Sequence, residues 1–365
     1  MNTKRTHPGT TKHNSAGNIK DVANAAGVSI ATVSRAFNRP DTVKQKTCDL
    51  VFEIASKLNY VPDSAARALV SQENRRIGAL IPTINDSIFT HFVGALQQRL
   101  SKDGYTLLIG VYDFDPDYEA KELRSLIESG VDGVVLCGGQ RPFGLYDLLQ
   151  QRSIPFITSN IYTPESPYPS VGPDFHACGV EVANHLVNLG HQNIGFIDLS
   201  PSKNDRAALR LSGVLQALKQ GSLKLPSSNY VERPLSIEDG RIGLRTLLEH
   251  SPDTTAVICG NDVHAIGAIF EATDAGISIP DELSIIGFDN LELSAQIKPG
   301  LTTVNLPTST MGIRVAEDLL LTLAGKPTPH ATRLESNLVI RGSTGPCRTN
   351  KTHLTEMSDQ LLERS

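Results

Sequence analysis

The sequence has no tryptophan, and aromatic residues make up only 5% of its 365 positions. It contains no uninterrupted apolar run near the roughly 20 residues that a helix needs to cross a bilayer. The polar segment from Met1 to Asn18 also lacks the apolar core of a secretory signal. We therefore expect a cytoplasmic protein with no membrane partner. At about 150 residues per domain, the length predicts two or three domains.

Cysteine is scarce. The five residues are far apart and never form a C-x-x-C pair: Cys48, Cys137, Cys178, Cys259 and Cys347. Their odd number and wide spacing argue against a disulfide framework and against a zinc site. We expect buried, reduced thiols, no bound metal and no other cofactor.

The short motifs of several enzyme classes are missing. There is no G-x-G-x-x-G, no G-x-x-x-x-G-K-[ST], no G-x-S-x-G and no H-E-x-x-H, and the ten histidines are dispersed. Such motifs supply the phosphate-binding loops, nucleophiles and metal ligands of common catalytic sites. Their absence favours a protein that binds without catalysing a reaction.

Charge is distributed unevenly along the chain. Residues 1–76 carry 12 Lys and Arg against 6 Asp and Glu, a net charge of +6. The rest of the chain carries 22 basic and 33 acidic residues, a net charge of −11. A basic module within an acidic protein indicates a surface that binds anions.

The basic part predicts three short helices. Asn18 is expected to cap a helix over residues 19–26 that ends at a glycine. Ser29 is expected to cap a second helix over residues 30–37. A third helix, from about 44 to 58, supplies an apolar face that two short helices alone cannot bury. A helix, a tight turn and a helix suit the DNA major groove, although other small helical bundles share this pattern.

The order and spacing of five segments in this part resemble the LacI family of bacterial transcription regulators. These segments are Ile19 to Ala23, Ala26 to Ser29, Thr32 to Arg35, Asn38, and Leu58 to Pro62. The resemblance implies a helix-turn-helix domain over 18–62 that binds a near-palindromic operator. The residues it places at DNA are Ser29, Ile30, Ala31, Thr32, Ser34, Arg35, Asn38, Tyr60, Ala66 and Leu69.

The two residues at the family's variable base-reading positions, Ile30 and Ala31, are both apolar. They can contact a thymine methyl group but offer no hydrogen-bond code. We therefore expect more of the sequence preference to come from Arg35 or from DNA shape.

Residues 63–75 have the composition of a short helix followed by a linker. The resemblance implies a hinge helix in which Leu69 wedges into the minor groove and bends the DNA. A plain flexible tether is the alternative. Asp63 stands where the family usually has Asn, and an acidic residue near phosphates is unfavourable for operator affinity.

The larger part of the chain, residues 76–342, alternates short β-rich runs with helical stretches, which predicts an α/β fold with largely parallel sheets. Ile194 to Ile197 echo Ile77 to Leu80, which indicates two similar subdomains. Together with the resemblance, this implies a periplasmic-binding-protein-like core. The expected parts are an N-subdomain (about 76–172 plus 305–331), a C-subdomain (about 173–304 plus 332–342), a disordered arm (1–17) and a tail (343–365).

A cleft between the two subdomains is where the resemblance implies a small-molecule effector. The residues it places there are Ile88, Phe89, Asn160, Ile161, Asp174, Arg206, Arg210, Leu235, Asp262 and Phe288. A buried Arg and Asp facing each other suit a polyol or a carboxylated molecule. Ile161 and Leu235 stand where many sugar-binding relatives have an aromatic platform, and two arginines favour an acidic ligand such as a sugar acid.

These features together predict a homodimeric DNA-binding repressor whose operator affinity is controlled by a sugar, a sugar acid or a similar metabolite. Whether that metabolite releases or promotes DNA binding stays open. The alternative is a small-molecule binding protein of the periplasmic type without DNA function. That class is expected to have a signal peptide and no basic helical module.

Overall fold

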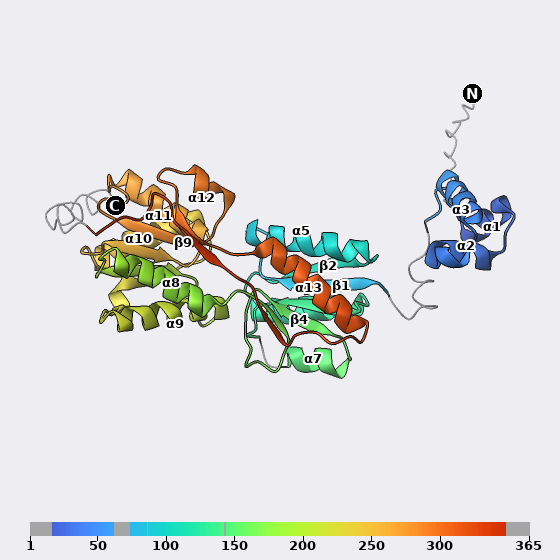
Figure 1. Ribbon diagram of the computed structural model, residues 1–365, viewed down its shortest axis with the longest axis horizontal. Helices are drawn as coiled ribbons and strands as arrows, with labels where there is room; N and C mark the ends of the chain where they lie inside the picture. The colour runs from blue at the N-terminus through green and yellow to red at the C-terminus, as the bar shows by residue number, and fades with distance from the viewer. Residues whose placement is uncertain (1–16, 62–73, 86, 142–143, 348–365) are drawn as a thin grey trace, which may run out of the picture. The chain divides into compact units, whose positions relative to one another are not determined.

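The computed structural model describes residues 17–61, 74–85, 87–141 and 144–347. The chain divides into two compact units, Met1–Asn74 and Arg75–Ser365 (Figure 1). The predicted arm before Gly17, most of the predicted hinge with Ala66 and Leu69, and the end of the tail lie outside the described residues.

Between Gly17 and Val61 the N-terminal unit has three helices: α1 (Ile19–Ala26), α2 (Ile30–Asn38) and α3 (Gln45–Lys57), with the short turn η1 (Pro40–Thr42) between the last two. Val22, Val33 and Val51 are fully buried where the helices meet. The three predicted helices are confirmed, with ends that differ by one residue at most. Gly17, predicted as the last residue of the arm, donates its N–H to the carbonyl of Leu58.

Local signals set the ends of α1 and α2. Asn18 and Asp21 form a capping box, in which each side chain accepts the other residue's backbone N–H. Gly27 ends α1 with φ at +65°, a conformation that glycine adopts without the steric cost of a β-carbon. The Ser29 hydroxyl then accepts the N–H of Thr32, at 3.1 Å. Both predicted caps are confirmed.

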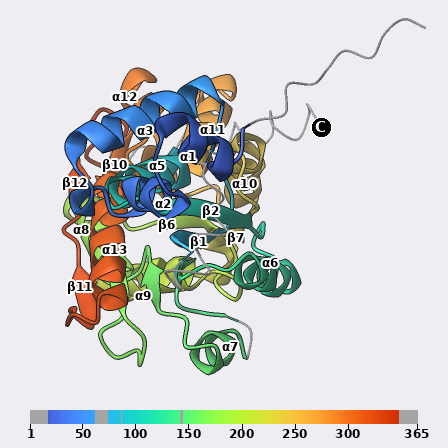
Figure 2. The same ribbon diagram turned by 90° about the vertical axis from the view of Figure 1, so that its right-hand side faces the viewer.

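The larger unit contains two six-stranded sheets. The first is entirely parallel and has the strand order β11-β5-β4-β3-β1-β2. Its strands are β1 (Arg76–Ile81), β2 (Thr106–Val111), β3 (Gly133–Cys137), β4 (Phe156–Ser159), β5 (Ser170–Gly172) and β11 (Ala331–Arg333). Helices α5 (Ser87–Lys102) and α13 (Thr308–Leu323) cover one face, and α6 (Pro116–Glu128) and α7 (Leu145–Gln151) the other (Figure 2).

The second sheet has the order β12-β10-β9-β8-β6-β7, and only β12 is antiparallel to its neighbour. Its strands are β6 (Ile194–Asp198), β7 (Tyr230–Glu232), β8 (Ala256–Cys259), β9 (Ser284–Asp289), β10 (Thr302–Asn305) and β12 (Asn337–Val339). Helices α8 (Phe175–Asn188) and α9 (Asp205–Gln220) cover one face, and α10 (Ile237–His250) and α11 (Asp262–Asp274) the other. The short elements η2 (Ser227–Asn229) and α12 (Glu292–Gln296) lie in connections.

The two sheets repeat one arrangement. Read from β2 and from β7, the first five strands follow the same order, and the echoing sequences over 77–80 and 194–197 lie in the matching strands β1 and β6. The prediction of two similar parallel-sheet subdomains is confirmed. The chain passes between them three times, after β5, after β10 and after β11. Because Arg333 still pairs with Gly172, the last passage comes two residues later than the expected boundary at residue 331.

The start of the predicted tail, from Ser343 to Cys347, is part of the second subdomain, so the expected boundary after Gly342 is too early. Ser343 is fully buried, and its hydroxyl donates to the carbonyl of Ile285 and accepts the N–H of Thr302. Gly345 bonds to Ser284, and the N–H of Cys347 bonds to the carbonyl of Leu189. Hydrogen bonds of backbone and hydroxyl groups hold this segment in place. Because these bonds require no apolar side chains, the sequence shows no pattern that predicts the position of the segment.

His191 joins this segment to the sheet. Its ring is 2% exposed and lies within 3.1 Å of the Ser284 hydroxyl and the Gly345 carbonyl, and within 3.0 Å of the Thr255 hydroxyl. Burial lowers the pKa of His191, and it also lowers the pKa of His264 on α11. Both imidazoles are therefore neutral in the folded protein at neutral pH.

We expect His191 and His264 to reduce the stability of the core unit as the pH falls below about 6.5, whereas the raised pKa of the Asp262 carboxyl acts in the opposite direction. The unfolded chain takes up protons there, whereas the folded chain resists them at His191 and His264, so acid favours unfolding. Urea denaturation at pH 7.0 and pH 5.5 measures the loss, and His191→Gln should reduce it. His250→Gln, at an exposed position near the end of α10, is the control. An equal pH dependence in all three proteins would contradict the assignment.

All five cysteines lie within the described residues and are free. Four are buried as expected, but Cys347 is half-buried, which corrects the prediction for that residue. No helix within the described ranges is both long and apolar enough to cross a membrane.

Candidate functional site

The N-terminal unit presents one side of α2 to solvent. Ile30 is 44% exposed, and four further residues predicted at DNA are also exposed: Ser29, Ala31, Arg35 and Asn38. The remaining three that the structure describes, Thr32, Ser34 and Tyr60, are half-buried. Ser29, Ile30 and Ala31 lie at the N-terminal end of α2, which favours negative groups such as phosphates, whereas Arg35 and Asn38 lie in its last turn.

Hydrogen bonds along α2 hold several of these side chains in place. The hydroxyls of Ser29 and Thr32 lie 2.9 Å apart, and Asn38 donates to the Ser34 hydroxyl at 3.3 Å. The Arg35 Nε donates to the Ala31 carbonyl at 3.2 Å, which keeps the guanidinium along the exposed side of the helix. Short polar side chains fixed in this way suit contact with a duplex.

Tyr60 has a packing role within the same unit. Its ring meets the ring of Phe37 edge-on, with 5.9 Å between centroids, and Phe37 in turn meets Phe52 at 5.1 Å. This contact fixes the chain where it leaves α3.

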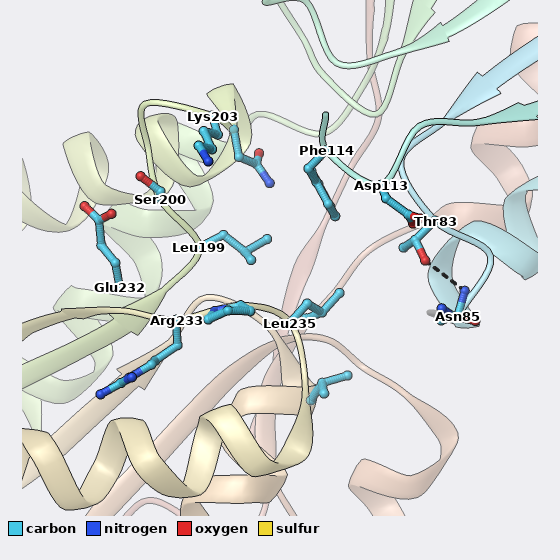
Figure 3. A pocket seen from close by; sticks show the side chains of 13 residues that line it. Thr83, Asn85, Asp113, Phe114, Leu199, Ser200, Lys203, Glu232, Arg233 and Leu235 are labelled. Atoms are coloured by element: carbon cyan, nitrogen blue, oxygen red, sulfur yellow. Dashed lines mark hydrogen bonds between the residues drawn. The ribbon is translucent and has the colours of Figure 1, made fainter. Parts of the chain in front are cut away.

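A cavity of about 700 Å³ lies in the larger unit, between loops that follow strands of the two sheets (Figure 3). The first subdomain contributes Thr83, Asn85, Asp113 and Phe114, and the second contributes Leu199, Ser200, Lys203, Asn204, Glu232, Arg233, Pro234, Leu235 and Val263. Open α/β sheets bind small molecules at this place, beyond the carboxyl ends of the strands.

A smaller cavity of about 40 Å³ lies beside the first and shares several of its lining residues. Six of the residues predicted at the effector line it: Ile88, Phe89, Asn160, Arg206, Arg210 and Leu235. Within the described residues, the lining of these cavities does not include the other four: Ile161, Asp174, Asp262 and Phe288.

The ion pairs of Arg206 and Arg210 are with Asp205 and Asp198 and not with Asp262, which corrects the expected Arg–Asp pair. The carboxylate of Asp262 accepts the hydroxyls of Ser294 and Thr303, each at 2.5 Å, and the N–H of Leu291 at 2.9 Å. The residue is fully buried, and burial raises the pKa of its carboxyl to about 6. Asp262 therefore ties α11 to the loop after β9 and to β10.

Asp174 lies at a passage between the subdomains. Its side chain caps α8 by accepting the N–H of Ala177 at 3.0 Å, and it lies 3.8 Å from the guanidinium of Arg333. Ala177 belongs to α8, which follows the first passage, and Arg333 belongs to β11, which precedes the last one. The described contacts of Asp174 are therefore structural.

Arg210 pairs with Asp198 at the end of β6. The contact is bidentate, with Nε–Oδ2 at 3.1 Å and Nη2–Oδ1 at 2.9 Å. The guanidinium also lies 5.4 Å from the ring centroids of Phe175 and Phe288. Phe288 thus supports Arg210 from within the core.

Arg206 is also paired, since its Nη1 lies 2.9 Å from Oδ1 of Asp205. Both arginines of the smaller cavity are therefore neutralised by carboxylates of the chain itself. An anion that bound these two guanidinium groups would have to compete with Asp205 and Asp198.

An aromatic surface enters the cavity from a place that the sequence did not indicate. Phe114, from the loop after β2, points into the cavity opposite Leu199 and Leu235 (Figure 3). Its backbone is in the left-handed region, with φ at +58°, as is that of Asp113 at +46°. Phe175, at the start of α8, lines the smaller cavity. Phe114 and Phe175 therefore add aromatic surface to the cavities beside the predicted Phe89.

Comparison with known proteins places both units in one family. Residues 18–63 match the bacterial regulatory proteins of the lacI family, and residues 183–344 match the periplasmic binding protein-like domain. The HTH-type transcriptional repressor CytR of Escherichia coli (strain K12) is 33% identical over 91% of this chain and 98% of its own. Catabolite control protein A of Priestia megaterium is 30% identical over 89% and 98%.

A solved structure agrees with these matches. The lac repressor dimer bound to operator and the anti-inducer ONPF is 25% identical, covers 89% of this chain and 98% of its own, and has a TM-score of 0.80. The chain belongs to the LacI family of bacterial regulatory proteins.

Proposed function

We propose that this protein is a transcriptional repressor that binds operator DNA and whose operator affinity depends on a small molecule in the cleft. The exposed, N-capped helix α2 carries this proposal, since Ile30, Ala31 and Arg35 lie together on the solvent side of a buried three-helix core. The cleft of the larger unit supplies a separate site for a small molecule. Neither role requires a catalytic step, and we propose that the protein acts by binding alone in the cytoplasm.

In this proposal Arg35 and Asn38 contact base edges or phosphates, while Ile30 and Ala31 contact thymine methyl groups. Ser29, Thr32, Ser34 and Tyr60 hold the helix and its surroundings in position. Ala66 and Leu69 belong to the proposed hinge, in which Leu69 inserts into the minor groove.

The protein is proposed to act as a homodimer on a near-palindrome. Several large apolar side chains of the core unit are exposed, including Ile84 and Ile109 in the first subdomain and Ile237, Phe270 and Leu293 in the second. Association of two copies would cover such surface. Two heads held in this way would read two half-sites about one helical turn apart.

The small molecule is proposed to lie between Phe114 and the leucines Leu199 and Leu235, with Asn160 and Asn204 as hydrogen-bonding groups. Arg210 remains part of the site, held by Asp198. A neutral ligand fits the paired arginines better than an acidic one.

Selection from a random DNA pool by the purified protein, at near-physiological salt, tests the proposal because salt suppresses nonspecific phosphate binding. Enrichment of a near-palindrome supports a repressor. If no sequence is enriched, alone or with metabolite mixtures, the alternative of a small-molecule binding protein without DNA function is favoured.

Arg35→Ala is expected to weaken binding to the selected site by about 1–3 kcal/mol and to relax the preference at one base pair. The reason is that this guanidinium lies on the exposed side of α2. Fluorescence anisotropy with variant sites measures both effects. Arg152→Ala, at an exposed position after α7, removes the same charge from the core and serves as the control. Equal behaviour of the two variants would remove Arg35 from the interface.

A further inference from the structure

A carboxylate of the second subdomain reaches across the cleft to the first. Asp205, the first residue of α9, accepts the backbone N–H groups of Gly139 and Gln140 through Oδ2, at 2.5 Å and 2.8 Å. These two residues follow β3 in the first sheet. Charge-assisted hydrogen bonds of this kind are among the stronger ones in proteins.

Asp205 is not needed to cap its own helix. The side chain of Asn204 already accepts the N–H groups of Arg206 and Ala207, at 3.1 Å and 3.3 Å. The carboxylate of Asp205 is therefore available for the opposite subdomain. Its side chain is only 15% exposed, so little water could hydrogen-bond to the carboxylate in place of the two amides if the contact were broken.

Hydrogen bonds from Arg141 and Tyr146 hold the loop after β3, to which Asp205 binds. Gly138 has φ at +78°, and successive amides around such a residue form a concave site for an anion. The buried guanidinium of Arg141 donates to the carbonyls of Cys137 and Gly138, and Tyr146 donates to the carbonyl of Gly139 at 2.7 Å. With its carbonyls occupied on one side, the loop presents its amides to Asp205 on the other.

Arg206 makes the contact between the subdomains broader. It pairs with Oδ1 of Asp205, and its side chain is 7% exposed. A β-carbon placed on Gly138 would lie 2.1 Å from its Nη1, so the guanidinium lies directly against the glycine backbone. Two adjacent charged residues of α9 thus contact one loop of the first subdomain.

We propose that Asp205 is a clasp that holds the two subdomains together across the cleft before any ligand enters. All of these contacts are made by the chain alone, so they bias the balance between open and closed arrangements. A ligand that favours one arrangement shifts this balance only by its difference in affinity for the two. A link between this open–closed balance and operator binding rests on the proposed function. The contact of Asp205 with the first subdomain does not depend on it.

Hydrogen exchange of the full-length protein, without DNA or small molecule, tests the contact. The amides of Gly139 and Gln140 are expected to exchange about tenfold faster or more in Asp205→Ala. Asp205→Asn keeps one acceptor oxygen and nearly the same shape, so its effect should be intermediate. Asp117→Ala removes an exposed first-turn carboxylate from α6 and should leave both amides unchanged.

A distance measured across the cleft distinguishes a contact that holds the two subdomains together from one with only a local effect. Nitroxide labels on cysteines at the exposed positions 147 and 216, in a Cys347→Ser background, report the separation of α7 and α9. The variant Asp205→Ala, or Asp205→Asn if the first does not fold, should shift the distances to longer values. Unchanged exchange overturns the proposal, and so does faster exchange with an unchanged distance. Because neither measurement uses DNA, failure of the repressor proposal would leave both results valid.

Discussion

Asp198→Ala is expected to lower the free energy of unfolding of the core unit by about 3–5 kcal/mol, because it leaves a buried arginine without its partner. The side chains of Asp198 and Arg210 are 1% and 7% exposed and share two hydrogen bonds. Water therefore has little access to the guanidinium once the carboxylate is gone. The rings of Phe175 and Phe288 offset only part of the loss.

Urea denaturation followed by circular dichroism measures this effect, since the chain has no tryptophan. Asp253→Ala, at an exposed position before β8, is the control and should change the free energy by about 0.5 kcal/mol or less. The double variant that combines Asp198→Ala with Arg210→Met removes both charges and should be more stable than the single variant. A loss below about 1 kcal/mol in the single variant would mean that the pair is not a buried ion pair in solution.

The helices of the N-terminal unit could be predicted closely because their signals are local. Asn18, Gly27 and Ser29 each act within three residues of the helix end that they set. The apolar positions of α1 to α3 repeat at helical spacing, so the same pattern predicts both the elements and their buried faces.

The two subdomains could be predicted because their central strands are buried on both faces and appear as continuous apolar runs, such as Val134 to Cys137 and Ala256 to Cys259. The segment from Ser343 to Cys347 has no such signal. Its place depends on hydrogen bonds to Ser284, Ile285 and Thr302, which are distant in sequence.

The candidate site could be predicted in part. Arg210 and Asn160 lie after or beside the carboxyl ends of strands and were found by their resemblance to family positions. The sequence does not predict that Asp198 is the partner of Arg210, because an ion pair depends on where each side chain points as well as on its position along the chain. Asp262 turns toward Ser294 and Thr303, while Asp198 at the end of β6 turns toward α9.

Phe114 shows a second limit of the sequence. Phe114 lies between Tyr112 and Tyr118 in an acidic loop without helical or strand periodicity, so nothing in the pattern indicates the direction of its side chain. Its position follows from a left-handed backbone at two successive residues, an arrangement that the surrounding fold has to support.

Gly213→Ala is expected to lower the stability of the core unit by about 1–3 kcal/mol, although alanine favours a helix more than glycine does. Helices α8 and α9 touch through their backbones at this point. A β-carbon on Gly213 would lie 2.1 Å from the carbonyl oxygen of His176, and one on Gly179 would lie 2.3 Å from that of Arg210. The helices must therefore move apart to admit a methyl group.

Gly221→Ala is the matched control, because Gly221 caps the same helix with φ at −77° and a β-carbon there would meet nothing nearer than 3.4 Å. Its stability should change by about 0.5 kcal/mol or less in the same urea titration. Separation of α8 from α9 also moves Phe175 relative to Arg210, so the Gly213 variant should lose the ring contact that supports the guanidinium. Equal stability of the two variants would mean that the helices are not in backbone contact in solution. A loss confined to Gly213→Ala would support backbone contact between α8 and α9 at this point.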